Sequence, residues 1–351
     1  MKLGIIGLNQ SGKTTVLNAL TGACKAVGTY GKSDTNVAVV KVPDERVDWL
    51  IKAYSPKKIV YANIEFIDIP GGIEDSSDPK IVAAARETDA LVCVVRAFDN
   101  PNVPHPNGTI DPLRDLGYIK TGLVVNDMSI AEKRLDRLKK TSSKGLAADE
   151  EKMELSILKK IMAHLEKEEP LSSLGLSEQE EKIIRSFQFL TLKPSLILLN
   201  VSENDLDSEK TAAHLGAMTN SMALSADTEM QIQTLEENDR LDFLEDAGIK
   251  ELSLNSLIRK AYSTLGLISF FTAGEKEVHA WTIKKDTKAV IAAGKIHSDL
   301  ERGFIRAEIF SFSDLKNLGS EREVKNAGKF RLEGKDYIVQ DGDIVVIKFS
   351  V

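Results

Sequence analysis

The sequence predicts an α/β protein: a mainly parallel sheet with helices on both faces, an inserted helical hairpin, and a small β-rich C-terminal domain. Three patterns predict it. Short apolar runs alternate with helix-like stretches over residues 1–117 and 194–264, strand patterns are absent from 118–193, and residues 265–351 alternate as strands do. A length of 351 residues is enough for two or three domains of this kind.

Five apolar runs predict the strands of the first domain, and each ends where glycine or polar residues begin. The runs are KLGII (2–6), NIEFI (63–67), ALVCVV (90–95), SLILL (195–199) and MAL (222–224). A helix-like stretch, 79–87, lies between the second and the third. Ligands of parallel sheets bind at the carboxyl ends of the strands, so the residues that follow these runs are the candidates for a site.

The inserted segment 118–193 carries charged, Leu/Ile-spaced patterns in AEKRLDRLKK and MELSILKKIMAHLEKEE, which predict two helices. Small and polar residues in TSSKGLAADE interrupt them, so we expect an antiparallel hairpin. The first arm is basic, and either a solvated helix face or a contact to a phosphate backbone accounts for that charge. Its basic residues are Lys133, Arg134, Arg137, Lys139, Lys140 and Lys144.

Composition excludes several classes of protein. With 46 Lys and Arg against 53 Asp and Glu the formal charge is −7, which argues against a nucleic-acid binder with a wholly basic surface. Cys24 and Cys93 offer neither a disulfide framework nor a CxxC metal motif. No apolar run approaches the ~18 residues of a membrane helix. We expect a cytoplasmic protein without a membrane partner and without DNA specificity.

The segment GLNQSGKT (7–14) fits the pattern GxxxxGK[ST], between a predicted strand and a predicted helix. In such a loop backbone N–H groups surround an oligophosphate, Lys13 reaches the terminal phosphates as a catalytic group, and the Thr14 hydroxyl ligates Mg²⁺. The residues predicted to contact nucleotide here are Asn9, Gln10, Ser11, Gly12, Lys13, Thr14 and Thr15.

Three further segments follow in the order expected of a GTPase-type site. DIPG (68–71) places Asp68 where it can hold the metal with Thr14, and offers the Gly71 N–H to a γ-phosphate. NVSE (200–203) is the base-contacting segment, through Asn200, Val201 and Glu203, and Ser225 with Ala226 shapes the same pocket.

The base-contacting segment departs from the NKxD pattern that reads guanine. Val201 stands in place of the Lys and Glu203 in place of the Asp. One extra methylene moves the carboxylate by more than an ångström, roughly, which spoils a bidentate pair built on fixed distances. We therefore expect a weakened preference for guanine.

These segments, with RETDALVCVVRAFDN (86–100), a long phrase beginning LGLISFFTAGEKEVHAW (265–281) and EGKDYIVQDGDIVVIKF (333–349), resemble the YchF or Obg-like ATPase family. The resemblance covers essentially the whole chain. It implies a P-loop nucleotide domain, a coiled-coil-like helical insertion and a C-terminal TGS domain of ubiquitin-like β-grasp fold. It also implies ATP used at least as well as GTP, Mg²⁺ as cofactor, and association with ribosomes or RNA.

Several positions depart from the family pattern. Gln10 replaces an Asn linked to monovalent-cation binding, and Lys32 stands where the first switch has a Thr, with Thr29 and Thr35 out of register. Gly72 follows DIPG, where related GTPases carry a water-orienting Gln.

His105, in FDNPNVPHP (98–106), aligns with a family histidine, and we assign it a catalytic role in positioning water. A histidine without function in a surface loop is the alternative. The leading hypothesis is a slow Mg²⁺-dependent nucleoside triphosphatase that favours ATP over GTP and binds ribosomes or RNA. A GTP-preferring switch and a nucleotide sensor with negligible hydrolysis are the alternatives.

Overall fold

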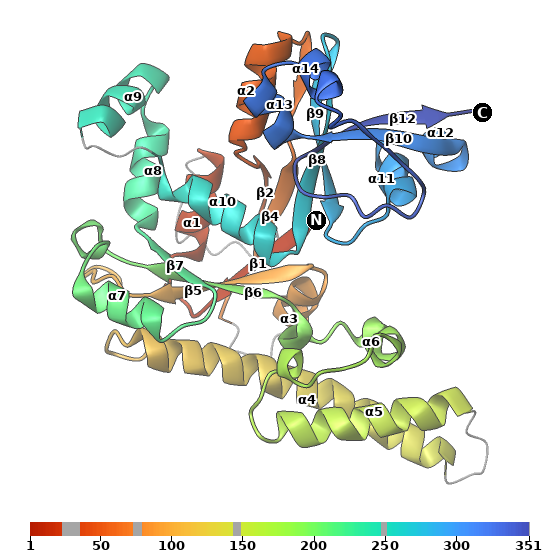
Figure 1. Cartoon of the computed structure of the whole chain (residues 1–351). Helices are drawn as coiled ribbons and strands as arrows, with labels where there is room; N and C mark the ends of the chain where they lie inside the picture. The colour runs from red at the N-terminus through yellow and green to blue at the C-terminus, as the bar shows by residue number, and fades with distance from the viewer. Residues whose placement is uncertain (23–35, 73–78, 143–148, 247–250, 351) are drawn as a thin grey trace. The chain divides into compact units, whose positions relative to one another are not determined.

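The computed structural model describes residues 1–22, 36–72, 79–142, 149–246 and 251–350 (Figure 1). The chain divides into two compact units, one made of residues 1–39 and 65–257 and the other of residues 40–64 and 258–351. Each unit is built on its own six-stranded sheet.

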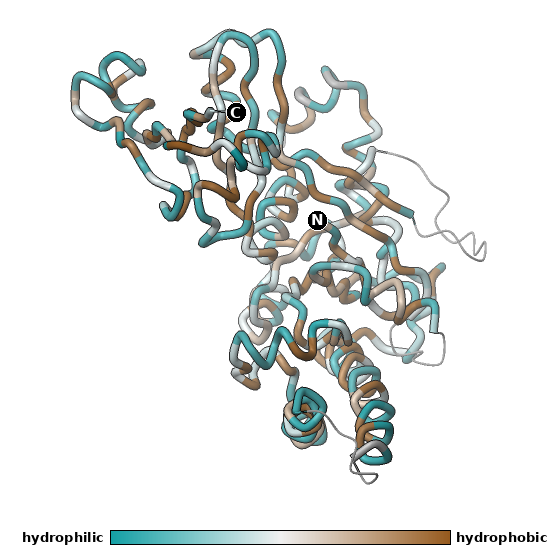
Figure 2. The backbone as a smooth tube through the Cα atoms, turned by 90° about the vertical axis from the view of Figure 1, so that its right-hand side faces the viewer, coloured by the Kyte–Doolittle hydropathy of each residue, from teal (hydrophilic) through white to brown (hydrophobic). Residues whose placement is uncertain are grey.

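The first sheet has the strand order β2-β4-β1-β5-β6-β7, and the pairs β4–β1, β1–β5, β5–β6 and β6–β7 are all parallel. Its strands are β1 (Lys2–Gly7), β2 (Asn36–Lys41), β4 (Asn63–Asp68), β5 (Ala90–Arg96), β6 (Ser195–Asn200) and β7 (Ser221–Leu224). The five apolar runs thus correspond to β1, β4, β5, β6 and β7, whereas β2 at the edge of the sheet was not predicted. Figure 2 colours the chain by hydropathy and shows its apolar segments in brown; the central strands β1, β5 and β6 are buried along almost their whole length.

Helices cover both faces of this sheet (Figure 1). One face packs on α3 (Pro79–Arg86) and on the first half of α4 (Pro112–Ser142), which share a core with β1, β5 and β6. On the other side, α1 (Lys13–Thr21) packs against α8 (Ala226–Thr234). The remaining elements of this unit are α7 (Glu209–Gly216), the short turn η4 (Glu203–Asp205) and α9 (Glu237–Asp246), and the boundary between the units falls within α10 (Ser253–Thr264).

The helical hairpin differs from the predicted insertion in where it begins. A single 31-residue helix, α4, contributes Leu116, Ile119 and Leu123 to the sheet core and Ala131, Leu135 and Leu138 to a separate hairpin core with α5 (Asp149–Leu165). The predicted boundary at residue 118 therefore falls inside a continuous helix, because apolar residues keep helical spacing across it. The return of the hairpin contains η1 (Leu171–Ser173), α6 (Glu178–Ile184), η2 (Arg185–Phe187) and η3 (Leu190–Leu192).

One residue of the basic run on α4 forms an ion pair inside the hairpin. The Arg134 guanidinium donates to both carboxylate oxygens of Glu154 on α5, at 2.7 Å each. Such a bidentate pair fixes the register of the two arms. Lys144 lies outside the described residues.

The base of the hairpin is fixed by one buried carboxylate and one lysine. Asp127 on α4 is 0% exposed and accepts the backbone N–H groups of Leu190 and Thr191 at 2.9 and 2.8 Å, and the Thr191 hydroxyl at 2.8 Å. Burial raises the pKa of Asp127, and these bonds oppose that rise. Lys193 Nζ donates to three carbonyl oxygens at the end of α3, those of Ala85, Arg86 and Thr88.

We expect Asp127→Ala to destabilise the first unit by about 3 kcal/mol, because three buried donors lose their acceptor at once. The urea midpoint measured by circular dichroism reports the loss. Asp149→Ala, which removes a carboxylate that is 95% exposed in the same hairpin, serves as the control and leaves the midpoint unchanged. Equal midpoints for the two variants would contradict the role of Asp127.

The second sheet has the order β11-β10-β12-β8-β9-β3. Strand β8 (Leu267–Ala273) pairs antiparallel with β9 (Glu277–Lys284) and parallel with the last strand, β12 (Asp343–Phe349). Helix α11 (Ala289–Ile296) packs on one face of this sheet, and together they form the β-grasp arrangement expected from the sequence. The other elements are β10 (Phe304–Ser311), β11 (Arg331–Glu333), α12 (Ser298–Arg302), α13 (Phe312–Leu318) and α14 (Glu321–Asn326).

Residues 40–64 belong to this second unit, although the sequence assigned them to the nucleotide domain. Strand β3 (Lys58–Val60) pairs in parallel with β9, from Lys58↔Glu277 to Val60↔His279. Helix α2 (Glu45–Tyr54) sets Trp49 edge-on to Phe312, with ring centroids 5.5 Å apart. The Arg46 guanidinium also bonds both carboxylate oxygens of Asp341, at 2.7 and 3.2 Å. These long-range contacts place residues 40–64 in the second unit, which the boundary predicted from the sequence at residue 265 does not include.

Within the described ranges, no helix is long and apolar enough to cross a membrane. Cys93 is buried in β5, as the sequence predicts, and burial raises the pKa of its thiol to about 12. Cys24 lies outside the described residues.

Candidate nucleotide-binding site

The loop between β1 and α1 leads into a helix N-terminus that has no side-chain cap. Gly12 precedes the first helical residue at φ 93°, and no side chain caps this helix end. By contrast, Ser225 caps α8 and Ser208 caps α7 through their side-chain oxygens. An uncapped helix N-terminus behind a glycine-rich loop is the arrangement that binds phosphate.

Lys13 lies against the same loop. Its ammonium donates to the carbonyl oxygens of Gly7 at 3.2 Å and Leu8 at 2.9 Å. Gln10 adopts the left-handed backbone conformation at φ 62°, so Gln10 is strained where an Asn stands in the family pattern. Ser11 has a buried hydroxyl without a hydrogen-bond partner in the part of the chain that is described.

Thr14 and Asp68 meet as the sequence predicts. The Thr14 hydroxyl donates to Asp68 Oδ2 at 2.8 Å, whereas Asp68 Oδ1 is buried and has no partner among the described residues. Burial raises the pKa of this carboxyl group, opposed by the Thr14 hydrogen bond and by the charge of Lys13. A buried, unpaired carboxylate oxygen beside a hydroxyl fits a hard divalent cation such as Mg²⁺.

Asn200 connects the P-loop to the start of α8. Its side-chain N–H donates to the Ser11 carbonyl oxygen at 3.1 Å, and its side-chain oxygen accepts the Ala226 N–H at 3.1 Å. The Asn200 side chain is 4% exposed. Asn200 therefore holds the phosphate loop and the predicted base-contacting segments in one arrangement.

Val201 and Glu203 differ from each other in burial. Val201 is 2% exposed, packs in the sheet core, and donates its N–H to the Leu224 carbonyl oxygen at 3.0 Å. Glu203 is exposed at the start of η4. Ser225 Oγ accepts the Thr228 N–H, so its hydroxyl serves α8 in addition to any role in a base pocket.

Of the residues after Asp68, the structure describes 69–72, and these provide backbone groups but no side chain for catalysis. Gly71 has φ 84°, and a Cβ atom here would lie 2.5 Å from Ile81 Cδ1 of α3. Gly72 is buried and supplies no group that could orient water. Thr29, Lys32 and Thr35 of the first switch lie outside the described residues.

The His105 side chain is buried, although the loop that carries it lies at the surface. Its side chain is 4% exposed, and Nε2 lies 2.8 Å from Asp115 Oδ2 in a close contact that is not aligned as a hydrogen bond. The Asn107 backbone N–H donates to His105 Nδ1 at 3.1 Å. His105, Asp115, Asn9 and Ser11 line one small enclosed space, so the ring lies beside the phosphate loop.

Arg96 is a residue of this site that the sequence analysis did not single out. Its guanidinium is buried at the end of β5 and donates to the carbonyl oxygens of Phe98 at 3.1 Å, Val103 at 2.8 Å and Gln10 at 3.5 Å. Burial lowers the pKa of Arg96. Arg96 thus joins the P-loop to the loop that carries His105. The sequence does carry a signal for Arg96, because it is a charged residue directly after the apolar run ALVCVV (90–95).

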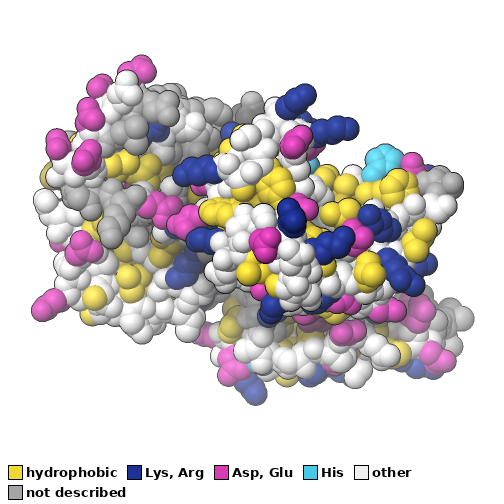
Figure 3. Space-filling model, turned by 45° about the horizontal axis from the view of Figure 1, so that its top comes forward, with side chains coloured by type: hydrophobic (Ala, Val, Ile, Leu, Met, Phe, Trp, Pro, Cys, Tyr) yellow, Lys and Arg dark blue, Asp and Glu magenta, His cyan; other side chains and the backbone are white. Residues whose placement is uncertain are grey.

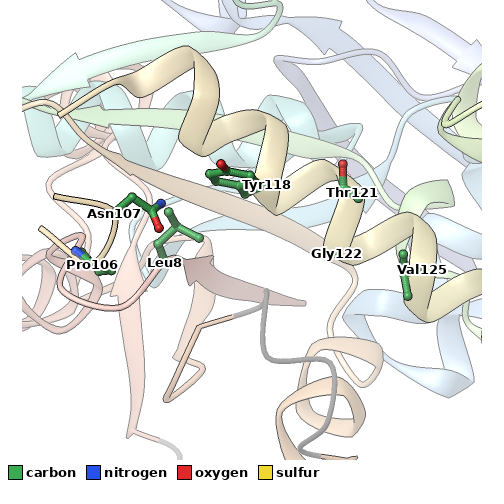
Figure 4. A pocket seen from close by; sticks show the side chains of 7 residues that line it. All are labelled: Leu8, Pro106, Asn107, Tyr118, Thr121, Gly122 and Val125. Carbon is green, nitrogen blue, oxygen red and sulfur yellow. The ribbon is translucent and has the colours of Figure 1, made fainter. Parts of the chain in front are cut away.

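A hollow of about 330 Å³ lies next to this loop (Figure 4). Tyr118, Thr121, Gly122 and Val125 of α4 line one side of it. Leu8 of the P-loop, Pro106 and Asn107 complete the wall.

The open phosphate loop, the Thr14–Asp68 pair and the Asn200 bridge define a P-loop nucleotide-binding protein of the GTPase class. A family model described as "50S ribosome-binding GTPase" matches residues 2–127. A second one, YchF-GTPase_C, described as "Protein of unknown function (DUF933)", matches residues 267–350.

The chain belongs to the YchF family. It is 40% identical over 364 residues to a Haemophilus influenzae protein named "Ribosome-binding ATPase YchF", covering 100% of this chain and 99% of that one. A Bacillus subtilis protein of the same name is 40% identical over 366 residues, with 99% of each chain covered. The solved structure of the Schizosaccharomyces pombe YchF GTPase matches with a TM-score of 0.84 at 34% identity, covering 99% of this chain and 97% of that chain.

Proposed function

We propose that this protein is a Mg²⁺-dependent nucleoside triphosphatase that binds and slowly hydrolyses ATP, uses GTP less well, and associates with ribosomes. The observation that carries the proposal is the Asn200 bridge, which joins an uncapped phosphate loop to the base-contacting segments. The names of the relatives from Haemophilus influenzae and Bacillus subtilis support both the ATPase activity and the ribosome partner.

The preference for ATP rests on Val201 and Glu203. Val201 packs in the core at the position where guanine-specific proteins carry a lysine, so a lysine here would have to displace core packing. The longer side chain of Glu203 moves its carboxylate away from the place that a bidentate contact to guanine needs. Both features weaken guanine recognition and leave the phosphate contacts intact.

Mg²⁺ would be held by Thr14 and Asp68 together with the phosphates. When bound, the cation neutralises charge on the phosphate oxygens. Lys13 and the N–H groups at the start of α1 bind and orient the same phosphates. The Gly71 N–H is the predicted donor to the terminal phosphate, and His105 is the predicted group that positions water.

Slow turnover follows from the absence of a water-orienting side chain at Gly72. His105 has both ring nitrogens in contact with other groups in this structure, which also favours a low basal rate.

A ribosome partner is supported by the names of the relatives more than by surface charge. On the face drawn in Figure 3, the Lys and Arg side chains of the described residues are interspersed with Asp, Glu and apolar side chains, so these residues form no broad basic patch there. Direct contact with RNA and a cytoplasmic location remain parts of this proposal.

The test is a competition titration of ATP and GTP with and without Mg²⁺, followed by turnover in the same samples. We expect ATP to bind at least as tightly as GTP, with binding strengthened by Mg²⁺ and with slow, measurable turnover. Glu203→Asp shortens the carboxylate by one methylene and should raise GTP affinity relative to ATP by about tenfold.

Clear preference of the unmodified protein for GTP would contradict the base assignment. Binding without turnover would contradict the enzymatic part and indicate a nucleotide sensor. Lys13→Ala is the control for nonspecific signal, because removal of the ammonium from the phosphate loop should abolish measurable affinity.

A further inference from the structure

The contacts of His105 point to a way in which hydrolysis is restrained. This inference rests on the function proposed above. A group that positions water needs a free ring nitrogen. In this structure Nδ1 accepts the Asn107 N–H at 3.1 Å, and Nε2 lies 2.8 Å from Asp115 Oδ2. A nitrogen that accepts a hydrogen bond carries no proton, so the neutral ring holds its proton on Nε2, facing the carboxylate.

Asp115 is held firmly in place. It lies in the first turn of α4 and is 1% exposed. Its other carboxylate oxygen, Oδ1, accepts from Arg114 Nε at 3.1 Å, from Arg114 Nη2 at 2.9 Å and from Asn107 Nδ2 at 3.4 Å. Oδ2 accepts no hydrogen bond within the described part of the chain, so His105 is the group that faces it.

We infer that Asp115 is a regulatory residue that restrains His105 in a docked position and thereby lowers basal hydrolysis. We call the contacts of His105 with Asp115 and Asn107 the His105 latch. Release of the latch frees one ring nitrogen for water at the phosphate loop, because the ring lies beside Asn9 and Ser11 of that loop.

The surroundings of the latch permit such a movement. Pro106 and Asn107, which follow His105, line the hollow of about 330 Å³ beside α4 (Figure 4). The loop therefore has open space beside these two residues into which it can shift. Arg96 holds the earlier part of the loop through the Val103 carbonyl oxygen, so the movement is confined to the residues after it.

The test compares ATP turnover of Asp115→Asn, His105→Ala, the double variant and the unmodified protein. The asparagine keeps an oxygen for Arg114 and Asn107 and replaces the oxygen that faces His105 by an N–H donor. We expect Asp115→Asn to raise kcat roughly five- to tenfold with KM unchanged, because the docked population falls. The rise should vanish in the double variant. Glu132→Gln makes the same carboxylate-to-amide change at an exposed position of α4 outside the latch; it is the matched control and should keep the basal rate.

A second readout does not depend on activity. In protein labelled with ¹⁵N-histidine, the His105 signals, assigned by their loss in His105→Ala, should report a proton on Nε2, and Asp115→Asn should shift them. A drop in kcat for Asp115→Asn would overturn the latch, because Asp115 would then align His105 for catalysis. A proton on Nδ1 would overturn it as well. Unchanged turnover in His105→Ala would instead contradict the predicted role of His105 in the proposed function.

Discussion

Gly12→Ala is expected to abolish nucleotide binding at micromolar protein concentrations while leaving the chain folded. Gly12 has φ 93°, and a Cβ atom there would lie 2.2 Å from Asn200 Nδ2. A side chain in this backbone conformation costs about 1–2 kcal/mol, and displacement of the packed Asn200 costs about 1–3 kcal/mol more. Because each 1.4 kcal/mol is roughly tenfold, we expect nucleotide affinity to fall on the order of 100-fold or more.

Gly175→Ala is the matched control for this prediction. Gly175 has φ 64°, and a Cβ atom there meets nothing within 4 Å, so the variant carries backbone strain without a clash. Fluorescent-nucleotide titration and thermal unfolding of both variants separate the two effects. Similar affinities for the two would contradict the close approach of Asn200 to the loop.

The fold was predictable wherever local pattern decides structure. Each apolar run became a strand of the first sheet because a buried parallel strand needs continuous apolar residues, a property legible in a single segment. Strand β3, by contrast, is the three-residue segment KIV. Its first residue, Lys58, pairs with Glu277 of β9, which lies 219 residues further along the chain. No local signal specifies that pairing, which is why the predicted domain boundaries missed it.

The start of α4 had a usable signal. Pro112 is a favoured first helical residue, and Leu116, Ile119 and Leu123 continue the helical spacing toward the hairpin. The change of composition near residue 118 reflects a change in what the helix packs against. It does not mark a new element.

The residues of the candidate site also fall into those that a local motif predicts and those that only the folded chain brings together. Lys13, Thr14 and Asp68 were predictable because the P-loop and the strand end after it fix where their side chains meet. Arg96 and Asp115 were not, since each acts through carbonyl oxygens or a ring that only the folded loop brings near. The first switch, with Thr29 and Thr35, remains a prediction.

Asn200→Ala is expected to lower nucleotide affinity on the order of 100-fold and to cost the first unit about 2–3 kcal/mol of stability. The variant leaves the Ser11 carbonyl oxygen and the Ala226 N–H without their partner, and both bonds are buried. Unlike Gly12→Ala, this change creates space instead of a clash, so the two halves of the site lose their connection while the P-loop backbone stays allowed.

Asn200→Asp separates the two bonds. The carboxylate can still accept the Ala226 N–H, but it cannot donate to the Ser11 carbonyl oxygen and faces it with negative charge. If the link to the P-loop sets phosphate affinity, the aspartate weakens ATP and inorganic pyrophosphate alike, as measured by competition titration. Asn126→Ala removes another buried amide, whose bond to the Gly122 carbonyl oxygen stays within α4, and should leave both affinities unchanged. Loss of ATP binding with pyrophosphate binding retained would show that Asn200 acts on the base and not through the phosphate loop.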